Sequence, residues 1–163
     1  MNAVVFYTKT SKGAYQLMAD LVQLSREISR FIVDPSELKR TASSSQRQRN
    51  LKTISYLKSA GYLRPIGQTK CELTDLGKIS VLRELVKRRK PDGKLRIIIF
   101  DIPENLKRNR DFFRRHLVNL GFKMEQRSVW RSKIPCEDLV ELVINYHHLN
   151  RYTALVVGNL TRY

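Results

Sequence analysis

The sequence predicts an α+β protein that consists of two small domains. Before residue 90, apolar residues recur mainly at helical spacing, whereas after residue 94 apolar, β-branched runs typical of buried strands appear. The run 87–93, Lys-Arg-Arg-Lys-Pro-Asp-Gly, joins a cluster of cations to a turn and separates the two patterns. We therefore expect one domain over residues 1–90 and a second over residues 91–163.

The chain is strongly basic. Its 163 residues include 31 basic and 15 acidic side chains, which gives a net charge of +16. Such a charge favours a polyanionic partner, and nucleic acid is a better candidate than an anionic membrane surface. Residues 1–90 hold 18 basic and 7 acidic side chains, against 13 and 8 in residues 91–163, so we expect the polyanion to bind mostly to the first half.

The sequence shows no pattern of a membrane or secreted protein. No apolar run approaches the roughly 18 residues that a membrane-spanning helix needs, and the first ten residues lack the pattern of a secretory leader. The sequence therefore predicts a cytoplasmic protein without a membrane partner. Cys71 and Cys136 lie far apart, with neither a CxxC spacing nor a cluster of histidines beside them, so we expect no zinc site and no disulfide.

Four helices and a hairpin are expected in the first half. The serines at 43–45 offer N-caps for the longest of these helices, and Gly61 is a suitable residue to end it. Leu51, Ile54 and Leu57 lie on one side of this helix, which predicts its core-facing side. The expected elements are, in order, a helix over 14–30, a short helix over 34–40, a helix over 46–60, strands over 62–64 and 71–73, and a helix over 74–85.

This order of elements is typical of a winged helix-turn-helix. The segment 60–82, AGYLRPIGQTKCELTDLGKISVL, closely resembles the wing of that family, with the turn of the hairpin at residues 65–69. The resemblance implies that the third helix enters the major groove of double-stranded DNA. It also implies that the hairpin tip contacts phosphates or the minor groove.

The polar face of the third helix is the predicted DNA-reading surface. Arg49 is suited to a bidentate pair with guanine, and Gln48 is suited to adenine. Lys52 and Tyr56 are suited to phosphates or the groove wall. The alternative is that these side chains form only the solvated face of an amphipathic helix. The candidate DNA-binding residues are Ser45, Gln46, Arg47, Gln48, Arg49, Lys52 and Tyr56 on the helix, with Arg64, Gln68 and Lys70 on the hairpin; Arg47 falls at a core angle but could reach the DNA backbone from the first turn.

The second half has the βαββαβ pattern of a ferredoxin-like domain. A small sheet with both helices on one face leaves the other face uncovered, so we expect a self-complementary homodimer. The expected elements are a strand over 95–101, a helix that ends at Gly121, a strand over 123–131, a short segment over 132–134, a helix over 136–148 and a strand over 152–158. The basic residues expected to point outward from the first of these helices are Lys107, Arg108, Arg114 and Arg115.

Particular residues of the second half also resemble a known family. The shared residues are the segment 100–104, Phe-Asp-Ile-Pro-Glu, then Arg110, the segment 120–122, Leu-Gly-Phe, then Gln126 and the segment 128–130, Ser-Val-Trp. They resemble the central domain of the PaaX-like, phenylacetate-catabolon repressor family, which is itself similar to the CRISPR-associated Cas-two subunit of the spacer-integration complex. Because that family also begins with a winged helix, the resemblance spans nearly the whole chain. It implies a dimeric transcriptional repressor that binds palindromic operators and is released by an acyl-coenzyme A effector.

The similarity to Cas-two also raises an enzymatic alternative. Asp101 matches an aspartate that lies at the dimer interface of the integration-complex subunit and is linked there to metal-dependent nuclease activity. One such carboxylate from each of two chains could hold a Mg²⁺ ion, so the alternative is a Mg-dependent endonuclease or a structural subunit of a CRISPR DNA-integration complex. We favour the simpler interpretation that Asp101 caps the following turn and that the protein has no catalytic residue, metal or cofactor.

The other candidates for chemistry are better explained by packing. No glycine-rich phosphate loop, HExxH pair or GxSxG elbow occurs in the sequence. His116, His147 and His148 are expected to be surface or packing residues, and Phe122 and Trp130 are expected in the sheet core or at a dimer face. The sequence thus favours a sequence-specific, DNA-binding transcriptional regulator. A purely architectural DNA-binding role is a further alternative.

Overall fold

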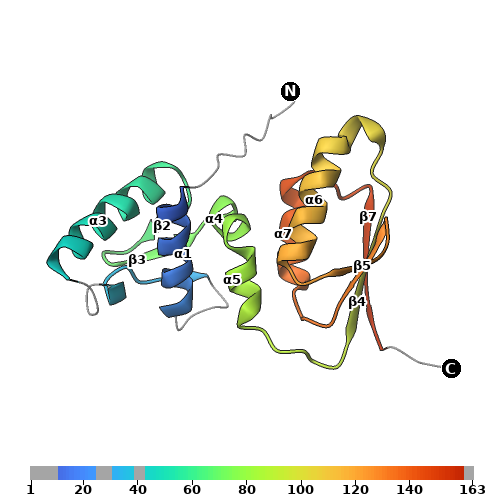
Figure 1. The fold of residues 1–163 in the computed structure, drawn as a ribbon, viewed down its shortest axis with the longest axis horizontal. Helices are drawn as coiled ribbons and strands as arrows, with labels where there is room; N and C mark the ends of the chain where they lie inside the picture. Colours follow the sequence, from blue (N-terminus) through green and yellow to red (C-terminus); the bar gives the residue numbers. More distant parts are fainter. Residues whose placement is uncertain (1–10, 25–30, 39–42, 160–163) are drawn as a thin grey trace. The chain divides into compact units, whose positions relative to one another are not determined.

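The computed structural model describes residues 11–24, 31–38 and 43–159. It confirms the α+β class, because helices and two antiparallel sheets make up the described chain. The chain forms two compact units, Met1–Ser80 and Val81–Tyr163, which are described separately below. Figure 1 shows the elements of both units, most of them labelled. No helix within the described ranges is long and apolar enough to cross a membrane.

The division between the units falls ten residues before the predicted domain boundary, because the segment before residue 91 is bonded to the second unit. The guanidinium of Arg89 donates to the backbone oxygen of Pro135 at 2.9 Å and pairs with the carboxylate of Asp138. The basic run therefore belongs to the second unit. Residues 1–80 hold 13 basic and 6 acidic side chains, or +7, and residues 81–163 hold 18 and 9, or +9, so the charge is not concentrated in the first unit.

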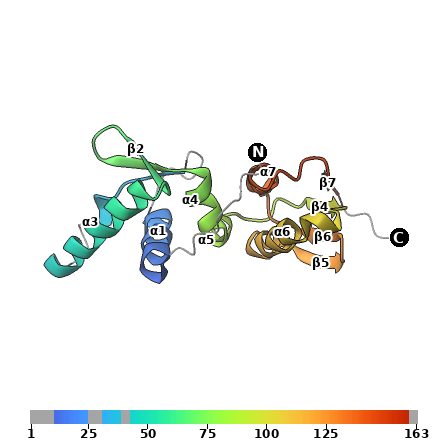
Figure 2. The ribbon, with the colours of Figure 1, turned by 90° about the horizontal axis from the view of Figure 1, so that it is seen from above.

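The first unit contains the predicted hairpin, helices at three of the predicted places and a short additional strand. Its elements are α1 (Lys12–Leu24), β1 (Ile32–Val33), α3 (Ser44–Ser59), β2 (Leu63–Ile66), β3 (Lys70–Leu73) and α4 (Asp75–Ser80). The three strands form an antiparallel sheet in the order β1-β3-β2. In Figure 2 the loop of the β2–β3 hairpin projects from this unit on the side away from α1.

Two of the predicted helices are only partly described, and a third differs from its prediction. The first was predicted over 14–30 and is observed up to Leu24, and its remaining residues lie outside the described ranges. Of the short helix predicted over 34–40, a helical turn is described at residues 37–38 and the rest lies outside the described ranges. The helix predicted over 74–85 is interrupted at Val81, whose φ of −124° is not helical, so it forms α4 and a separate α5 (Leu82–Lys87).

The core-facing side of α3 is rotated from the predicted one. Ile54 and Leu57 are buried as expected, but the side chain of Leu51 is 53% exposed. Leu51 lies one helical step, about 100°, from the direction in which the buried residues of α3 point. The prediction that Leu51 packs in the core is therefore wrong, since the packing of α3 on α1 and β2 decides which side is covered.

Contacts of Thr74 and Gly77 fix the positions of α3, the hairpin and α4 relative to one another. Thr74 caps α4 as predicted, accepting from the backbone N–H of Gly77 at 3.1 Å and donating to the oxygen of Gly61 at 2.6 Å. A Cβ atom at Gly77 would lie 2.2 Å from the backbone oxygen of Tyr62, so no larger residue fits without a shift. The end of α3, the base of the hairpin and the start of α4 are thus held as one piece.

The second unit has the topology of a ferredoxin-like domain. Its elements are α5, β4 (Leu95–Phe100), η1 (Glu104–Leu106), α6 (Lys107–Asn119), β5 (Lys123–Gln126), β6 (Val129–Ser132), α7 (Glu137–Tyr146) and β7 (Thr153–Gly158). The sheet order β5-β6-β4-β7, with every neighbouring pair antiparallel, is that of a βαββαβ fold. The strand predicted over 123–131 is in fact a hairpin, β5 and β6, with its turn at residues 127–128, and the segment predicted over 132–134 is not a separate strand.

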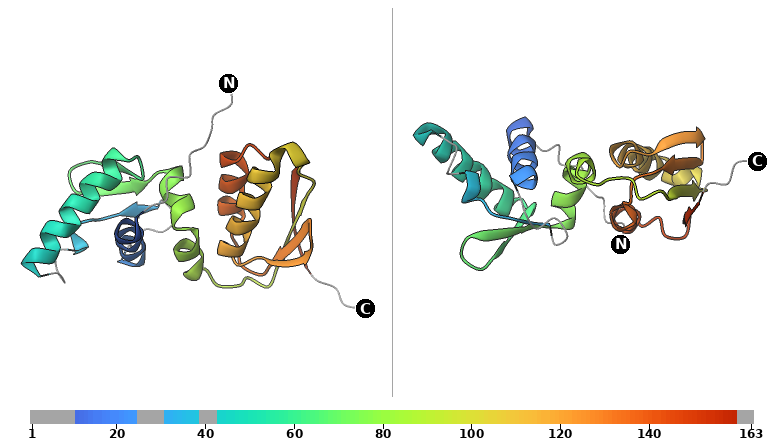
Figure 3. Two further views of the ribbon diagram at one scale, coloured as in Figure 1. Left: turned by 45° about the horizontal axis from the view of Figure 1, so that its top comes forward. Right: turned by 90° about the horizontal axis from the view of Figure 1, so that it is seen from below.

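Both helices of the βαββαβ unit, α6 and α7, cover the same face of this sheet, as Figures 1 and 3 show. On the covered face, Ile98 and Trp130 are buried. On the opposite face, Ile99 is 46% exposed and Val156 is 50% exposed. The register places their neighbours on that face too. The apolar residues of this open sheet face are Ile97, Ile99, Val129, Ala154 and Val156.

Candidate nucleic-acid interface

The start of α3 concentrates positive charge. Ser43 caps the helix, as predicted, by accepting from the backbone N–H of Gln46 at 3.4 Å. The helix contains no acidic residue, and its cations are Arg47, Arg49, Lys52 and Lys58. The partial positive charge at the N-terminus of a helix adds to that of the side chains. This end of α3 is therefore a suitable place for a polyanion.

All seven α3 residues predicted to contact DNA are solvent exposed. Gln48 and Lys52 point most directly away from the buried residues, while Arg49 lies toward one flank. Arg47, predicted at a core angle, is exposed on the other flank. The structure thus leaves these side chains accessible to a partner. The exposed residues are Ser45, Gln46, Arg47, Gln48, Arg49, Lys52 and Tyr56.

The three hairpin candidates have different surroundings. Arg64 on β2 faces Glu72 on β3 in the strand register, and the two side chains form an ion pair. The charge of Arg64 is therefore partly balanced within the hairpin, which weakens its suitability for phosphate. Gln68 and Lys70 are exposed in and beside the turn, where Gly67 adopts a left-handed φ of +59°.

A small hollow of about 170 Å³ lies between α3 and the hairpin turn. It brings together Arg47 from the helix and Gln68 from the turn, two predicted candidates that are 21 positions apart in sequence. It is also lined by residues that sequence reasoning missed, including Asn50, Leu51 and Thr69. Asn50 accepts from the side-chain amide of Gln46 at 2.9 Å, within the same polar surface. The exposed position of Leu51 was the feature that the helical pattern alone could not reveal.

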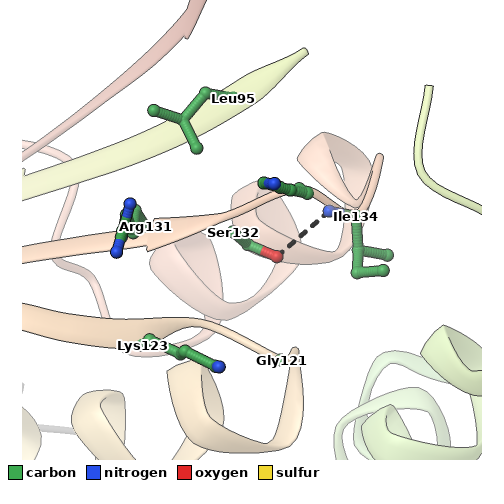
Figure 4. A pocket seen from close by; sticks show the side chains of 7 residues that line it. Leu95, Gly121, Lys123, Arg131, Ser132 and Ile134 are labelled. Carbon is green, nitrogen blue, oxygen red and sulfur yellow. Dashed lines mark hydrogen bonds between the residues drawn. The ribbon is translucent and has the colours of Figure 1, made fainter. Parts of the chain in front are cut away.

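A second hollow, of about 430 Å³, lies at one end of the sheet of the second unit. Figure 4 shows Leu95, Lys123, Arg131 and Ile134 around it, with the Ser132 hydroxyl accepting from the Ile134 N–H at 3.2 Å. Lys133 also lines it, so three cations border an apolar wall. Arg131 is paired with Glu125, whereas no ion pair within the described residues holds either lysine.

Asp101 lies in a third, open hollow of about 540 Å³ together with Arg151 and Tyr152. Its backbone N–H donates to the oxygen of Tyr152 at 2.9 Å, but its carboxylate accepts no hydrogen bond from the described residues. The predicted turn-capping role of Asp101 is therefore wrong. In the described part of the chain, no group of three or more His, Cys, Asp or Glu residues is arranged to hold a metal ion.

The histidines and large aromatics of the second unit serve mainly in packing, as predicted. His116 and His147 are buried and their rings lie 5.2 Å apart, and Phe122 and Trp130 are buried as well. Burial, followed by the charges of His147 and Arg115, lowers the pKa of His116 to about 3. Burial, followed by the charge of His148, lowers the pKa of His147 to about 4. Both rings are thus neutral at neutral pH.

These features define a basic α+β protein with an acid-free helix beside a hairpin in one unit and a ferredoxin-like sheet in the other. Residues 88–162 match the model of the PaaX protein central Cas2-like domain. The match covers the second unit of the chain and agrees with the PaaX-like resemblance that its sequence pattern predicted. No curated protein and no solved structure gives a significant match to the chain.

Proposed function

We propose that the protein is a cytoplasmic, sequence-specific DNA-binding transcriptional regulator that acts as a dimeric repressor. The observation that carries the proposal is the start of α3, a capped and acid-free helix whose cations and glutamine side chains are all exposed beside a hairpin. The match of residues 88–162 to the PaaX protein central Cas2-like domain supports a regulatory role, because it agrees with the sequence resemblance to a repressor family. The two described cysteines, Cys71 and Cys136, are unbridged and buried, which is compatible with a reducing compartment.

The first unit is proposed to act as a winged helix. Its α3 has 16 residues, so it is about 24 Å long and narrow enough for the major groove, which is about 12 Å wide. Gln48 and Arg49 near the start of the helix would contact base edges, and Lys52 and Tyr56 would contact the backbone or groove wall. Lys70 and Gln68 on the hairpin would contact neighbouring phosphates. Arg64 is a weaker contributor because Glu72 already balances its charge.

The open sheet face of the second unit is proposed to pair two copies of the chain. Its apolar residues would be covered by the same residues of a partner in a two-fold arrangement. A two-fold dimer would present two copies of α3 to two half-sites, so the operator would be a palindrome.

Selection of bound sequences from a random double-stranded DNA pool tests DNA recognition. We expect a two-fold symmetric motif for the wild type. Replacing Arg49 with Ala should weaken binding to that motif by about 1–3 kcal/mol and relax the preference at one position of each half-site. Arg83→Ala, which removes an exposed arginine from α5, is the matched control and should leave both unchanged. Binding that depends on DNA length but not on sequence would contradict the proposal.

The dimer is tested by sedimentation of the full chain. Ile99→Lys and Val156→Lys should each shift the protein toward monomer, because each places a charge in the centre of the proposed apolar interface. Val118→Lys is the control, since Val118 is 59% exposed on α6, away from the sheet. A wild-type monomer at micromolar concentration, or equal dissociation by all three variants, would count against this interface.

The family resemblance also suggests an acyl-coenzyme A effector, and the hollow beside Leu95 is the proposed place for it. An acyl chain would lie on the apolar wall and an anionic group near Lys123 and Lys133. A calorimetric titration with acetyl-coenzyme A, with coenzyme A alone and with sodium acetate tests this. Loss of heat in the Lys123→Gln/Lys133→Gln variant would support the site. An unchanged titration in that variant would contradict this binding site.

A further inference from the structure

The outer face of α6 carries two arginines stacked on one aromatic ring. Arg108, Phe112 and Arg115 follow the spacing i, i+4, i+7 and so lie on one side of the helix. The guanidinium carbon of Arg115 lies 4.4 Å from the centre of the Phe112 ring, and that of Arg108 lies 5.6 Å from it. Both arginines are exposed, while the ring is half-buried.

The Phe112 ring is itself held in place. It stacks on the buried imidazole of His147, the C-cap residue of α7, with 6.1 Å between ring centres and 9° between ring planes. A guanidinium stacked on a fixed ring loses less conformational freedom when it binds, and its N–H groups still point outward. The two arginines are therefore ordered before any partner arrives, unlike isolated surface lysines.

The neighbouring arginines of α6 are engaged within the protein, but these two are not ion-paired. Arg110 donates to Glu104 at 2.8 Å and to the oxygen of Ile102 at 3.2 Å. Arg114 lies 3.9 Å from the carboxylate of Asp111 and donates to a backbone oxygen at 3.1 Å.

Arg115 makes a hydrogen bond of 3.3 Å from Nε to the backbone oxygen of Asp111, which is an uncharged acceptor. Within the described residues no carboxylate pairs with Arg108 or Arg115. Two ordered and uncompensated charges therefore stand side by side on α6.

We propose that the stacked pair Arg108 and Arg115 binds phosphates of double-stranded DNA, as a second contact surface outside the winged helix. The inference rests on the proposed DNA-binding function. The planar guanidinium matches a phosphate better than a lysine does, and the second unit, at +9, is as basic as the first. A convex helix face offers no hollow for a base, so the contact adds affinity without adding sequence preference.

The salt dependence of DNA binding tests the proposal, because each phosphate contact adds about 0.9 to the slope of log K against log salt. For the double variant Arg108→Gln/Arg115→Gln, we expect the slope of the full chain to fall by about 1 to 2, equally on the selected motif and on a scrambled duplex. The matched control is Arg83→Gln/Arg127→Gln, which removes two exposed arginines elsewhere in the second unit and should change the slope by less than half as much. An equal fall in both double variants, or no fall in the first, would overturn the inference.

Phe112→Leu separates ordering from charge. It keeps both arginines and an apolar side chain of similar size but removes the stacking surface, so binding should weaken several-fold while the protein keeps its net charge. Unchanged affinity in this variant would contradict the role of the ring.

The same experiments distinguish failure of this inference from failure of the proposed function. If the double variant keeps the wild-type salt slope and the selected motif is palindromic, only the role of the arginine pair is contradicted. If the slope falls but no motif is selected, only sequence-specific recognition is contradicted.

Discussion

The two units carry similar net charges, +7 and +9, but they hold their cations in different ways. In the first unit, α3 has four cations and no acid, and its predicted contact residues are exposed. In the second unit, four of the described arginines are tied to carboxylates by close ion pairs. The pairs are Arg89–Asp138, Arg96–Asp92, Arg96–Glu137, Arg110–Glu104 and Arg131–Glu125. Charge that balances a neighbour fixes the fold, and only charge left over is available to a partner.

The comparison changes how the basic composition is interpreted. Counting residues on either side of the predicted boundary assigned the polyanion to the first half. With the observed division the two units have similar net charges, so net charge no longer points to either of them. The useful criterion is which basic side chains lack an ion-pair partner. By that criterion, α3 is the main candidate surface and the stacked arginines of α6 are the second.

The largest effect of a single substitution is expected in the apolar core of the first unit. Leu57 on α3 is fully buried, so Leu57→Ala should lower the free energy of unfolding by about 3 kcal/mol. Leu51→Ala on the same helix should cost less than about 1 kcal/mol, because Leu51 is 53% exposed. Urea unfolding followed by circular dichroism measures both. Similar losses for the two variants would mean that the core-facing side of α3 has been placed wrongly.

The next largest effect on stability is expected from the buried arginine of the second unit. The side chain of Arg96 is 2% exposed and its guanidinium donates to Asp92 at 2.6 Å and to Glu137 at 2.7 Å. Arg96→Met should destabilise the unit by about 2 kcal/mol, below the full effect of breaking a closed buried pair, since the two carboxylates are 37% and 40% exposed. Fluorescence of Trp130, the single tryptophan, reports the unfolding of this unit. A change within 0.5 kcal/mol, as expected for Arg83→Met, would contradict a structural role.

Mild acid should distinguish the units, since all three histidines lie in the second. The pKa values of His116 and His147 are lowered from 6.5 to about 3 and about 4. In the unfolded chain both rings gain a proton below pH 6.5, but in the folded unit they do not, so stability should fall from about pH 6.5 toward pH 4. Linkage with these pKa values gives a loss of about 2 kcal/mol for each ring, or about 4 kcal/mol in all, by pH 5.

The control for acid sensitivity is a pair of histidine variants. His116→Leu should reduce the pH dependence of the Trp130 unfolding transition. His148→Gln should change it much less, because burial comes before the charge of His148 among the causes that lower the pKa of His147. Equal pH dependence in wild type and in the His116 variant would show that other groups, such as the carboxylates that titrate at lower pH, account for the acid response.

The smallest effect is expected from the ion pair of the hairpin. The Arg64 side chain is 70% exposed, so its pairing with Glu72 should contribute less than about 1 kcal/mol to stability. A double-mutant cycle with Arg64→Gln and Glu72→Gln measures this coupling. In DNA binding, Glu72→Gln alone should strengthen affinity, because it frees Arg64 for phosphate. Weaker binding by that variant would mean that Glu72 is needed to position the hairpin.

Local patterns predicted much of the fold. The cap at Ser43, the hairpin and the βαββαβ order all follow from capping residues and apolar runs within short windows. Strand β1 was missed because two residues, Ile32 and Val33, cannot show an alternation, and they form a strand only by pairing with β3. The β5–β6 turn was missed because Arg127 and Ser128 include neither glycine nor proline.

The candidate sites, too, could be predicted from sequence only where a single element forms them. The exposed polar side of α3 could be predicted from helical angles, because an outer surface needs only one helix. The stack of Arg108 and Arg115 on Phe112 depends on His147, 35 positions further along the chain, which supports the ring from the end of another helix. The cross-strand partner of Arg64 likewise depends on the strand register. Contacts between elements decide which of the basic residues remain available.

The arrangement around Arg96 also has an evolutionary consequence. Asp92 and Glu137 approach one buried guanidinium from the turn before β4 and from the start of α7. If Arg96 became apolar, two carboxylates would face each other without a cation, and if both acids were lost, a cation would be buried without a counter-ion. Among relatives, positions 92, 96 and 137 should therefore vary together, which an alignment of PaaX-like sequences can test.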